Sequence, residues 1–312
     1  MKKANKVFST YFKQFFKDLS KIISQGEITQ NSIIIAYYML FSIFPIIIIV
    51  GNILPLFQIN AKPLTEYLNL ILPKQVAEFV IPIISSLLNQ HSSGFISFGI
   101  IVALWSFSSL INSIRMSMNK IYGVYSQEKG KPWWNYLLSR VITLFVTTLM
   151  IIVMILLSLG LAFGKQIVEF LGPILNIDVT WIYKLDSYKW PLVLVMMVIL
   201  NIYLNYALPN ISQFKHVVWP GTIVTVISWG ALAYFFGLYL QYFGTKWQNY
   251  GIVGTFIVFM LWLNIMALLY LFGVCINATI NKLKNGDVSY SRTSFWRAIK
   301  NNYLLKSKQN ES

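Results

Sequence analysis

The chain has 312 residues, of which 56% are hydrophobic and 11% are charged, and its mean hydropathy is +0.62. About a quarter of the residues of a soluble domain are charged, so this composition excludes an ordinary soluble globular protein. The formal net charge of +15 would favour nucleic-acid binding in a soluble protein, but here the charges must first be placed along the chain. The single cysteine excludes an intramolecular disulfide and a cysteine-rich metal site.

Residues 1–30 are predicted to form a cytoplasmic tail that contains an amphipathic helix. Lysines occupy one helical face, and the opposite face is apolar and rich in aromatic residues: Phe8, Tyr11, Phe12, Phe15, Phe16, Leu19, Ile22 and Ile23. This pattern is typical of a helix that lies on the inner leaflet with its lysines at anionic headgroups. A calmodulin-like target helix or a partner helix is the alternative interpretation.

Residues 31–281 contain six long apolar stretches, in which the only Asp, Glu, Lys or Arg is Arg140 near the start of the third. They begin near Ile33, Phe95, Leu137, Pro191, Val217 and Ile252. A helix needs about 20 apolar residues to cross a bilayer core, and each stretch is near or above that length. The first stretch is too long for a signal-peptide core, so we expect it to remain as an anchor. The sequence therefore predicts an all-α, polytopic membrane protein with six transmembrane helices.

The connection between the first two spans, about residues 58–93, carries a second amphipathic pattern from Val76 to Leu88. Pro73 and Pro82 argue against a full span there. We expect short helices on the outer rim, which serve either as a structural cap over the bundle or as a gate.

The basic residues indicate the topology. If the N-terminus is cytoplasmic, 19 of the 25 Lys and Arg residues lie in inner segments, including seven in the basic tail, residues 282–312. The positive-inside rule then predicts that both termini face the cytoplasm. The excess charge is explained by topology and by attraction to anionic lipid, so we expect no nucleic-acid partner.

Polar side chains follow one face of several spans at helical spacing. Hydrocarbon offers these groups no hydrogen-bond partner, so they should face the bundle interior or a wet cavity. They either hold the helices together through interhelical hydrogen bonds or line a cavity open to the inside, in which Arg115 attracts phosphate or carboxylate. The candidates for lining such a cavity are Tyr38, Ser42, Asn112, Arg115 and Asn205.

Four further positions are candidates for close helix packing or for hinges. Proline removes a backbone hydrogen bond inside a helix, and glycine allows two helices to approach closely. These positions are Pro45, Gly221, Gly251 and Gly254.

The residue types present do not favour catalysis. The two histidines, His91 and His216, are predicted on opposite sides of the membrane, so they cannot form a metal cluster or a catalytic triad together. The sequence contains no phosphate-binding Gly-x-x-x-x-Gly-Lys loop. We therefore expect no enzyme activity, no metal and no cofactor.

Several sequence blocks resemble a known family. The blocks are Ala-Tyr-Tyr-Met-Leu-Phe-Ser-Ile-Phe-Pro at 36–45, Leu-Trp-Ser at 104–106 followed by Asn-Lys-Ile-Tyr at 119–122, Trp-Pro-Gly at 219–221, and Asn-Tyr-Gly-Ile-Val-Gly at 249–254 through Leu-Trp-Leu at 261–263. In order and spacing they resemble the YihY/BrkB family of bacterial inner-membrane proteins. The resemblance covers most of the chain and implies a six-helix membrane fold in the bacterial plasma membrane.

The family also carries an older name, ribonuclease BN, and the resemblance would extend that activity to this protein. A tRNA nuclease would ordinarily need clustered histidines and carboxylates for metal, which this sequence does not supply. Relatives often show Gly-Ala-Glu-Leu-Asn in the last span, whereas residues 273–277 read Gly-Val-Cys-Ile-Asn, so Cys275 replaces the glutamate. If that carboxylate couples protons in relatives, this protein lacks it or couples differently.

Three functions follow as hypotheses. The first is passage of an amphiphile or lipid-like molecule through a polar space between the helices. The second is a non-transporting scaffold for envelope integrity, and the third, which the residues disfavour, is a membrane-bound ribonuclease.

Overall fold

The computed structural model describes residues 2–53, 93–128, 189–211, 217–247 and 251–286, together with positions 81, 145, 149 and 288. The predicted third span and the predicted outer helices within residues 58–92 lie outside this part of the chain, as does the tail beyond residue 288. The described elements are α1 (Lys2–Gly26), α2 (Ile28–Ile53), α5 (Ser93–Ile121), α6 (Tyr125–Glu128), α9 (Lys189–Ala207), α10 (Trp219–Trp247) and α11 (Gly251–Asn285). All are helices, which confirms the all-α prediction for the described residues.

Two of these helices are long and apolar enough to cross a membrane. They contain the segments Trp219–Tyr239 of α10 and Phe256–Asn285 of α11. Shorter apolar segments lie in α2, Ile28–Ile43, and in α9, Pro191–Ala207. Length and composition therefore indicate a membrane protein.

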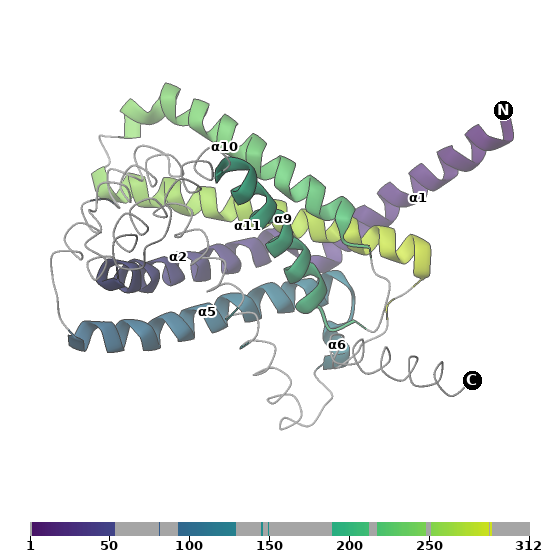
Figure 1. Cartoon of the computed structure of the whole chain (residues 1–312). Helices are drawn as coiled ribbons and strands as arrows, with labels where there is room; N and C mark the ends of the chain where they lie inside the picture. The colour runs from purple at the N-terminus through teal and green to yellow at the C-terminus, as the bar shows by residue number, and fades with distance from the viewer. Residues whose placement is uncertain are drawn as a thin grey trace, which may run out of the picture.

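Helix α11 is the centre of the packing. It contacts α1, α2, α5 and α10, while α2 packs along α5 and α9 packs against α10 (Figure 1). One apolar core joins α1, α2, α5 and α11, and Ile35, Ile111, Met118 and Leu271 are fully buried within it. The faces of these helices that meet in the core carry aliphatic side chains such as Ile35, Ile111 and Leu271.

The chain turns sharply between α1 and α2. Glu27 has a φ of 45°, in the left-handed region, and this residue separates the two helices. The side-chain amide of Asn31 donates to the carbonyl oxygen of Gly26 at 2.7 Å, which satisfies a carbonyl at the end of α1. The predicted tail, residues 1–30, therefore includes the first turn of α2.

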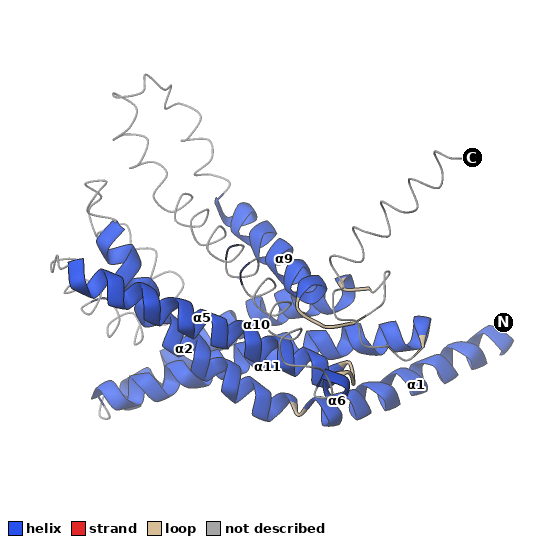
Figure 2. Cartoon of the chain, turned by 90° about the horizontal axis from the view of Figure 1, so that it is seen from below, coloured by secondary structure: helices blue, strands red, loops and turns tan. Residues whose placement is uncertain are grey.

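Helix α1 confirms that the amphipathic segment is helical, but its apolar face has two environments. Leu19 and Ile22 are buried in the core against the bundle, so the C-terminal part of that face is used for packing within the protein. Asp18 also pairs with Lys282 of α11 at 3.4 Å. The N-terminal half extends beyond the helices that α1 contacts (Figures 1 and 2), and Tyr11 and Phe16 are exposed there. The last turns of this apolar face are therefore buried against the bundle.

Candidate functional site

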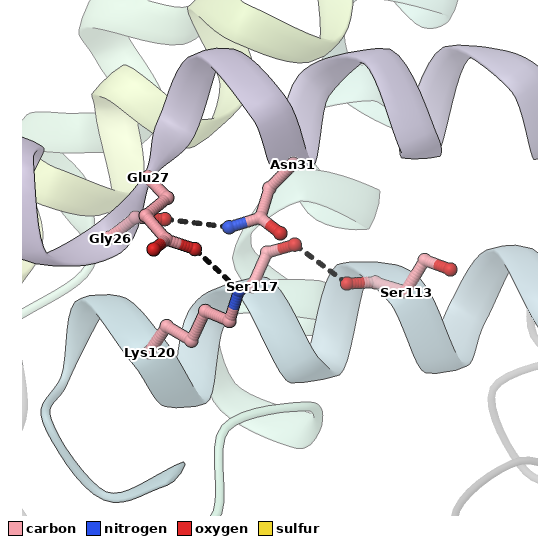
Figure 3. A network of polar contacts seen from close by, with 6 residues as sticks. All are labelled: Gly26, Glu27, Asn31, Ser113, Ser117 and Lys120. Atoms are coloured by element: carbon pink, nitrogen blue, oxygen red, sulfur yellow. Dashed lines mark hydrogen bonds and ion pairs between the residues drawn. The ribbon is translucent and has the colours of Figure 1, made fainter.

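One end of the bundle is a polar junction between the α1–α2 turn and the end of α5 (Figure 3). Lys120 of α5 pairs with Glu27 at 2.8 Å across this junction. Gly26 lies so close to α5 that a β-carbon added there would be 2.6 Å from Cγ1 of Ile121. These contacts fix the start of α2 beside the end of α5, so the two helices run antiparallel.

The Lys120 ammonium changes the acidity of Glu27. The hydrogen bond and the positive charge of Lys120 lower the pKa of Glu27 below its ordinary value of 4.5. The carboxylate is solvent-exposed, so the ion pair contributes little to stability by itself and chiefly orients the turn.

Serines on α5 use their hydroxyls within their own helix. Ser113 donates to the carbonyl oxygen of Ser109 at 2.9 Å, and Ser117 donates to that of Ser113 at 2.7 Å (Figure 3). Such bonds satisfy the hydroxyl without another helix. The small serine side chains can therefore lie among packed helices without needing a partner there.

Arg115 is the notable charged residue of α5. Its side chain is only 4% exposed, and Nη2 donates to Oδ1 of Asn112 at 3.3 Å. Asn112 in turn donates to the sulfur of Met116 at 3.5 Å. A buried guanidinium is costly unless dipoles or anions surround it, so this turn of α5 is the strongest candidate for an anion-attracting site.

Two other cavity candidates, Tyr38 and Ser42, lie on α2, the neighbour of α5. The contacts of Gly26 and Glu27 set the register, and equal rise along two antiparallel helices places Tyr38 about one turn from the level of Asn112. Tyr38 is partly buried against the core. Ser42 is buried, and its hydroxyl donates to the carbonyl oxygen of Tyr38 at 2.7 Å, so it serves its own helix.

The fifth candidate, Asn205, belongs to a different group of residues. Its Nδ2 donates to Oδ1 of Asn201 at 3.0 Å, and its Oδ1 accepts from Asn277 of α11 at 3.1 Å. Thr222 of α10 also donates to Oδ1 of Asn201 at 3.0 Å. We call Asn201, Asn205, Thr222, Asn277 and Asn281 the amide network; it joins α9, α10 and α11, and it differs from the α2–α5 group in the helices it connects.

The amide network builds the start of α10. Oδ1 of Asn277 accepts from the backbone N–H of Gly221 at 2.7 Å, and Oδ1 of Asn281 accepts from that of Val217 at 2.7 Å. The first N–H groups of a helix lack partners inside the helix, and here α11 supplies acceptors for two backbone groups at this end. Nδ2 of Asn201 is buried without a hydrogen-bond acceptor, so the chain of bonds ends at this donor.

Gly221 and Gly273 allow α10 and α11 to touch. A β-carbon on Gly221 would collide with the carbonyl oxygen of Gly273 and would be 2.5 Å from Cγ of Asn277. Gly221, a predicted packing or hinge position, therefore lies at a backbone-to-backbone contact. This contact leaves no room for a side chain on either helix, so both the glycine of the Trp-Pro-Gly block and Gly273 of α11 are needed there.

The remaining packing or hinge candidates lie in α2 and α11. Helix α2 continues through Pro45 to Ile53, so this proline leaves the helix unbroken although it has no N–H to donate. Gly251 begins α11, and Gly254 is buried one turn later.

Two hydrogen bonds between distant segments involve residues outside the predicted cavity candidates. Ser32 of α2 donates to Oδ1 of Asn264 of α11 at 2.8 Å, and the backbone N–H of Asn210 donates to Oδ1 of Asn119 at 2.9 Å. The position of Asn264 inside an apolar stretch was the available signal, because an amide there needs a partner. Within the described ranges, no three His, Cys, Asp or Glu side chains lie together as metal ligands would.

Comparison with known proteins identifies the family. Residues 19–294 match the family described as virulence factor BrkB. The chain belongs to this family. It is also 26% identical over 270 residues to the Bacillus subtilis (strain 168) protein named "Putative ribonuclease-like protein YfkH", which covers 86% of this chain and 96% of that protein. No solved structure matches this BrkB-family chain.

Proposed function

We propose that this BrkB-family protein is a transporter-like protein of the bacterial plasma membrane that moves an amphiphile with an anionic headgroup. In this proposal six helices span the membrane and both termini face the cytoplasm, as the excess of basic residues in the inner segments suggests. The headgroup would follow the polar side of α2 and α5 near their inner ends.

The buried guanidinium of Arg115 carries this proposal. Six residues separate it from the end of α5, so it lies about 9 Å inside the helix end, deeper than an arginine that only anchors a span at the interface. A guanidinium at that depth favours phosphate or carboxylate, which it can bind through two parallel hydrogen bonds. Asn112 adds a polar group about one turn from Arg115, and the partly buried Tyr38 adds another about one turn beyond Asn112.

The amide network supports a second candidate, a non-transporting scaffold. Its bonds run between side chains and backbone groups of the same protein, as expected where polar groups serve only to hold helices together. A scaffold would retain protein partners on affinity capture and would show no flux after purification. Because Asn205 belongs to the amide network, it is no longer a candidate for the transport site. Substitution of Arg115 is therefore the experiment that distinguishes transport from a scaffold role.

Flux in sealed proteoliposomes tests the proposal. Labelled phospholipids and other anionic amphiphiles would be followed with the unaltered protein and with Arg115→Gln. Lys120→Gln is the matched control, since it removes a partly exposed cation from the same end of α5. Flux that falls at least about tenfold in Arg115→Gln and persists in Lys120→Gln, with equal thermal stability, supports transport; no flux under any gradient favours the scaffold.

The name of the Bacillus subtilis relative raises nuclease activity as a third possibility. We propose that the present chain is no enzyme, because its sequence offers no cluster of histidines and carboxylates for metal-assisted hydrolysis. The purified protein should leave tRNA intact with added Mg²⁺, Mn²⁺ or Zn²⁺. Cleavage that disappears on chelation would contradict this proposal.

A further inference from the structure

The apolar face of α1 continues beyond the protein that it packs against. Leu19 and Ile22 are buried in the core, while Tyr11, Phe12 and Phe16 are 61%, 56% and 52% exposed. At 100° per residue, Phe12 and Phe16 fall on the same side of the helix as Leu19. The same stripe therefore meets the bundle in its last turns and leaves it in the preceding turns (Figures 1 and 2).

The charge on the opposite face of α1 indicates what kind of surface the exposed stripe binds. Lys13, Lys17 and Lys21 lie on the opposite face, which is solvent-exposed. The acidic residue of this part of α1, Asp18, is paired with Lys282. The exposed half thus presents aromatic rings and unopposed positive charge, the combination that favours an anionic bilayer surface.

Helix α1 packs at the basic end of the bundle. Its buried turns contact the ends of α5 and α11, where Lys120, Lys282 and Lys284 lie. Basic residues gather on the cytoplasmic side of membrane proteins, and the surface beside that end of a bundle is the inner leaflet. The side of α1 that faces the bundle is also the side that carries the exposed rings.

We propose that the N-terminal half of α1 docks on the anionic inner leaflet through Tyr11, Phe12 and Phe16, while its last turns anchor it to the bundle. The ion pairs Asp18–Lys282 and Glu27–Lys120 attach the last turns of α1 and the turn after them to α11 and α5. This inference is independent of transport, because it concerns a surface outside the α2–α5 site.

A fluorescent label on the full-length protein tests the docking. Cys275 is the single cysteine and is fully buried, so Cys275→Ala gives a background free of reactive thiols. An environment-sensitive dye would be attached to Phe12→Cys and, as the matched control two residues along on the opposite face, to Gln14→Cys. Both proteins would be reconstituted in vesicles of phosphatidylcholine alone and of phosphatidylcholine with phosphatidylglycerol.

With phosphatidylglycerol, we expect the dye at position 12 to shift to shorter wavelength and to be quenched by spin-labelled lipid, while the dye at position 14 stays accessible to aqueous iodide. The shift should shrink without anionic lipid, at high salt, and in the Lys13→Glu, Lys17→Glu, Lys21→Glu protein. A dye at position 12 that is accessible to iodide in every vesicle would overturn the proposal and favour a protein partner for this face. Equal protection in detergent would also overturn it, because the face would then be covered by the protein itself.

Discussion

At the scale of single residues, Gly221 shows how closely α10 and α11 approach. Gly221→Ala places a methyl group against the carbonyl oxygen of Gly273 and the side chain of Asn277, so the helices must separate. Overpacking of this kind costs about 1–3 kcal/mol. We expect a clear fall in the midpoint of thermal unfolding in detergent, measured by tryptophan fluorescence.

Gly230→Ala on the same helix is the control for this substitution. Nothing lies within 4 Å of a β-carbon at that position, and alanine favours helix, so stability should stay the same or rise. Equal losses in the two variants would show that glycine at position 221 is not required for packing.

Asn205 and Asn277 should be energetically coupled. Their side chains share a hydrogen bond of 3.1 Å between α9 and α11, and interhelical bonds in membrane proteins contribute about 0.6–1.7 kcal/mol. A double-mutant cycle with alanine at both positions, measured by unfolding in mixed micelles, should give a coupling energy in that range. The control cycle combines Asn277→Ala with Tyr11→Ala on exposed α1 and should be additive within about 0.5 kcal/mol.

At the scale of elements, the α1–α2 turn should respond to pH through Glu27. Its pKa is lowered in the folded protein, so the ion pair contributes fully above the ordinary value of 4.5 and is lost as the pH falls through the lowered pKa. The unaltered protein should therefore exceed Glu27→Gln in thermal stability at neutral pH, and the difference should vanish once the pH has fallen below the lowered pKa of Glu27.

A second variant separates charge from backbone conformation at this turn. Glu27→Gly also removes the carboxylate, but it relieves the left-handed φ of 45°. It should be more stable than Glu27→Gln both at neutral pH and below the lowered pKa of Glu27. A pH-independent difference between the unaltered protein and Glu27→Gln would show that the ion pair with Lys120 does not operate in solution.

The elements also show what the sequence could predict. Apolar length identified the helices, because helix geometry and bilayer thickness are local constraints that composition reveals. The two environments of the α1 stripe were not predictable, since Leu19 and Phe12 look alike until the end of the bundle is known. Polar periodicity singled out Asn205 and Arg115 equally, but only the folded structure places one in the amide network and leaves the other on α5.

At the scale of the whole molecule, the sided distribution of charge predicts topology. In the Cys275→Ala background, Lys189→Cys at the start of α9 should react with a membrane-impermeant maleimide added outside sealed, right-side-out vesicles. Lys284→Cys, exposed near the end of α11, should react only after permeabilisation. The reverse pattern would contradict the assignment of both termini to the cytoplasm.

The central place of α11 has a consequence for biosynthesis. This helix is made after the other helices of the described core, yet it supplies contacts to α1, α2, α5 and α10 and the acceptors that complete the start of α10. Earlier helices can insert one by one, but their inward amides lack these partners until residues 251–285 leave the ribosome. A nascent chain stopped before Gly251 should therefore remain a set of inserted but unassembled helices that membrane proteases can degrade. Assembly of the described core would then be completed only when α11 is made.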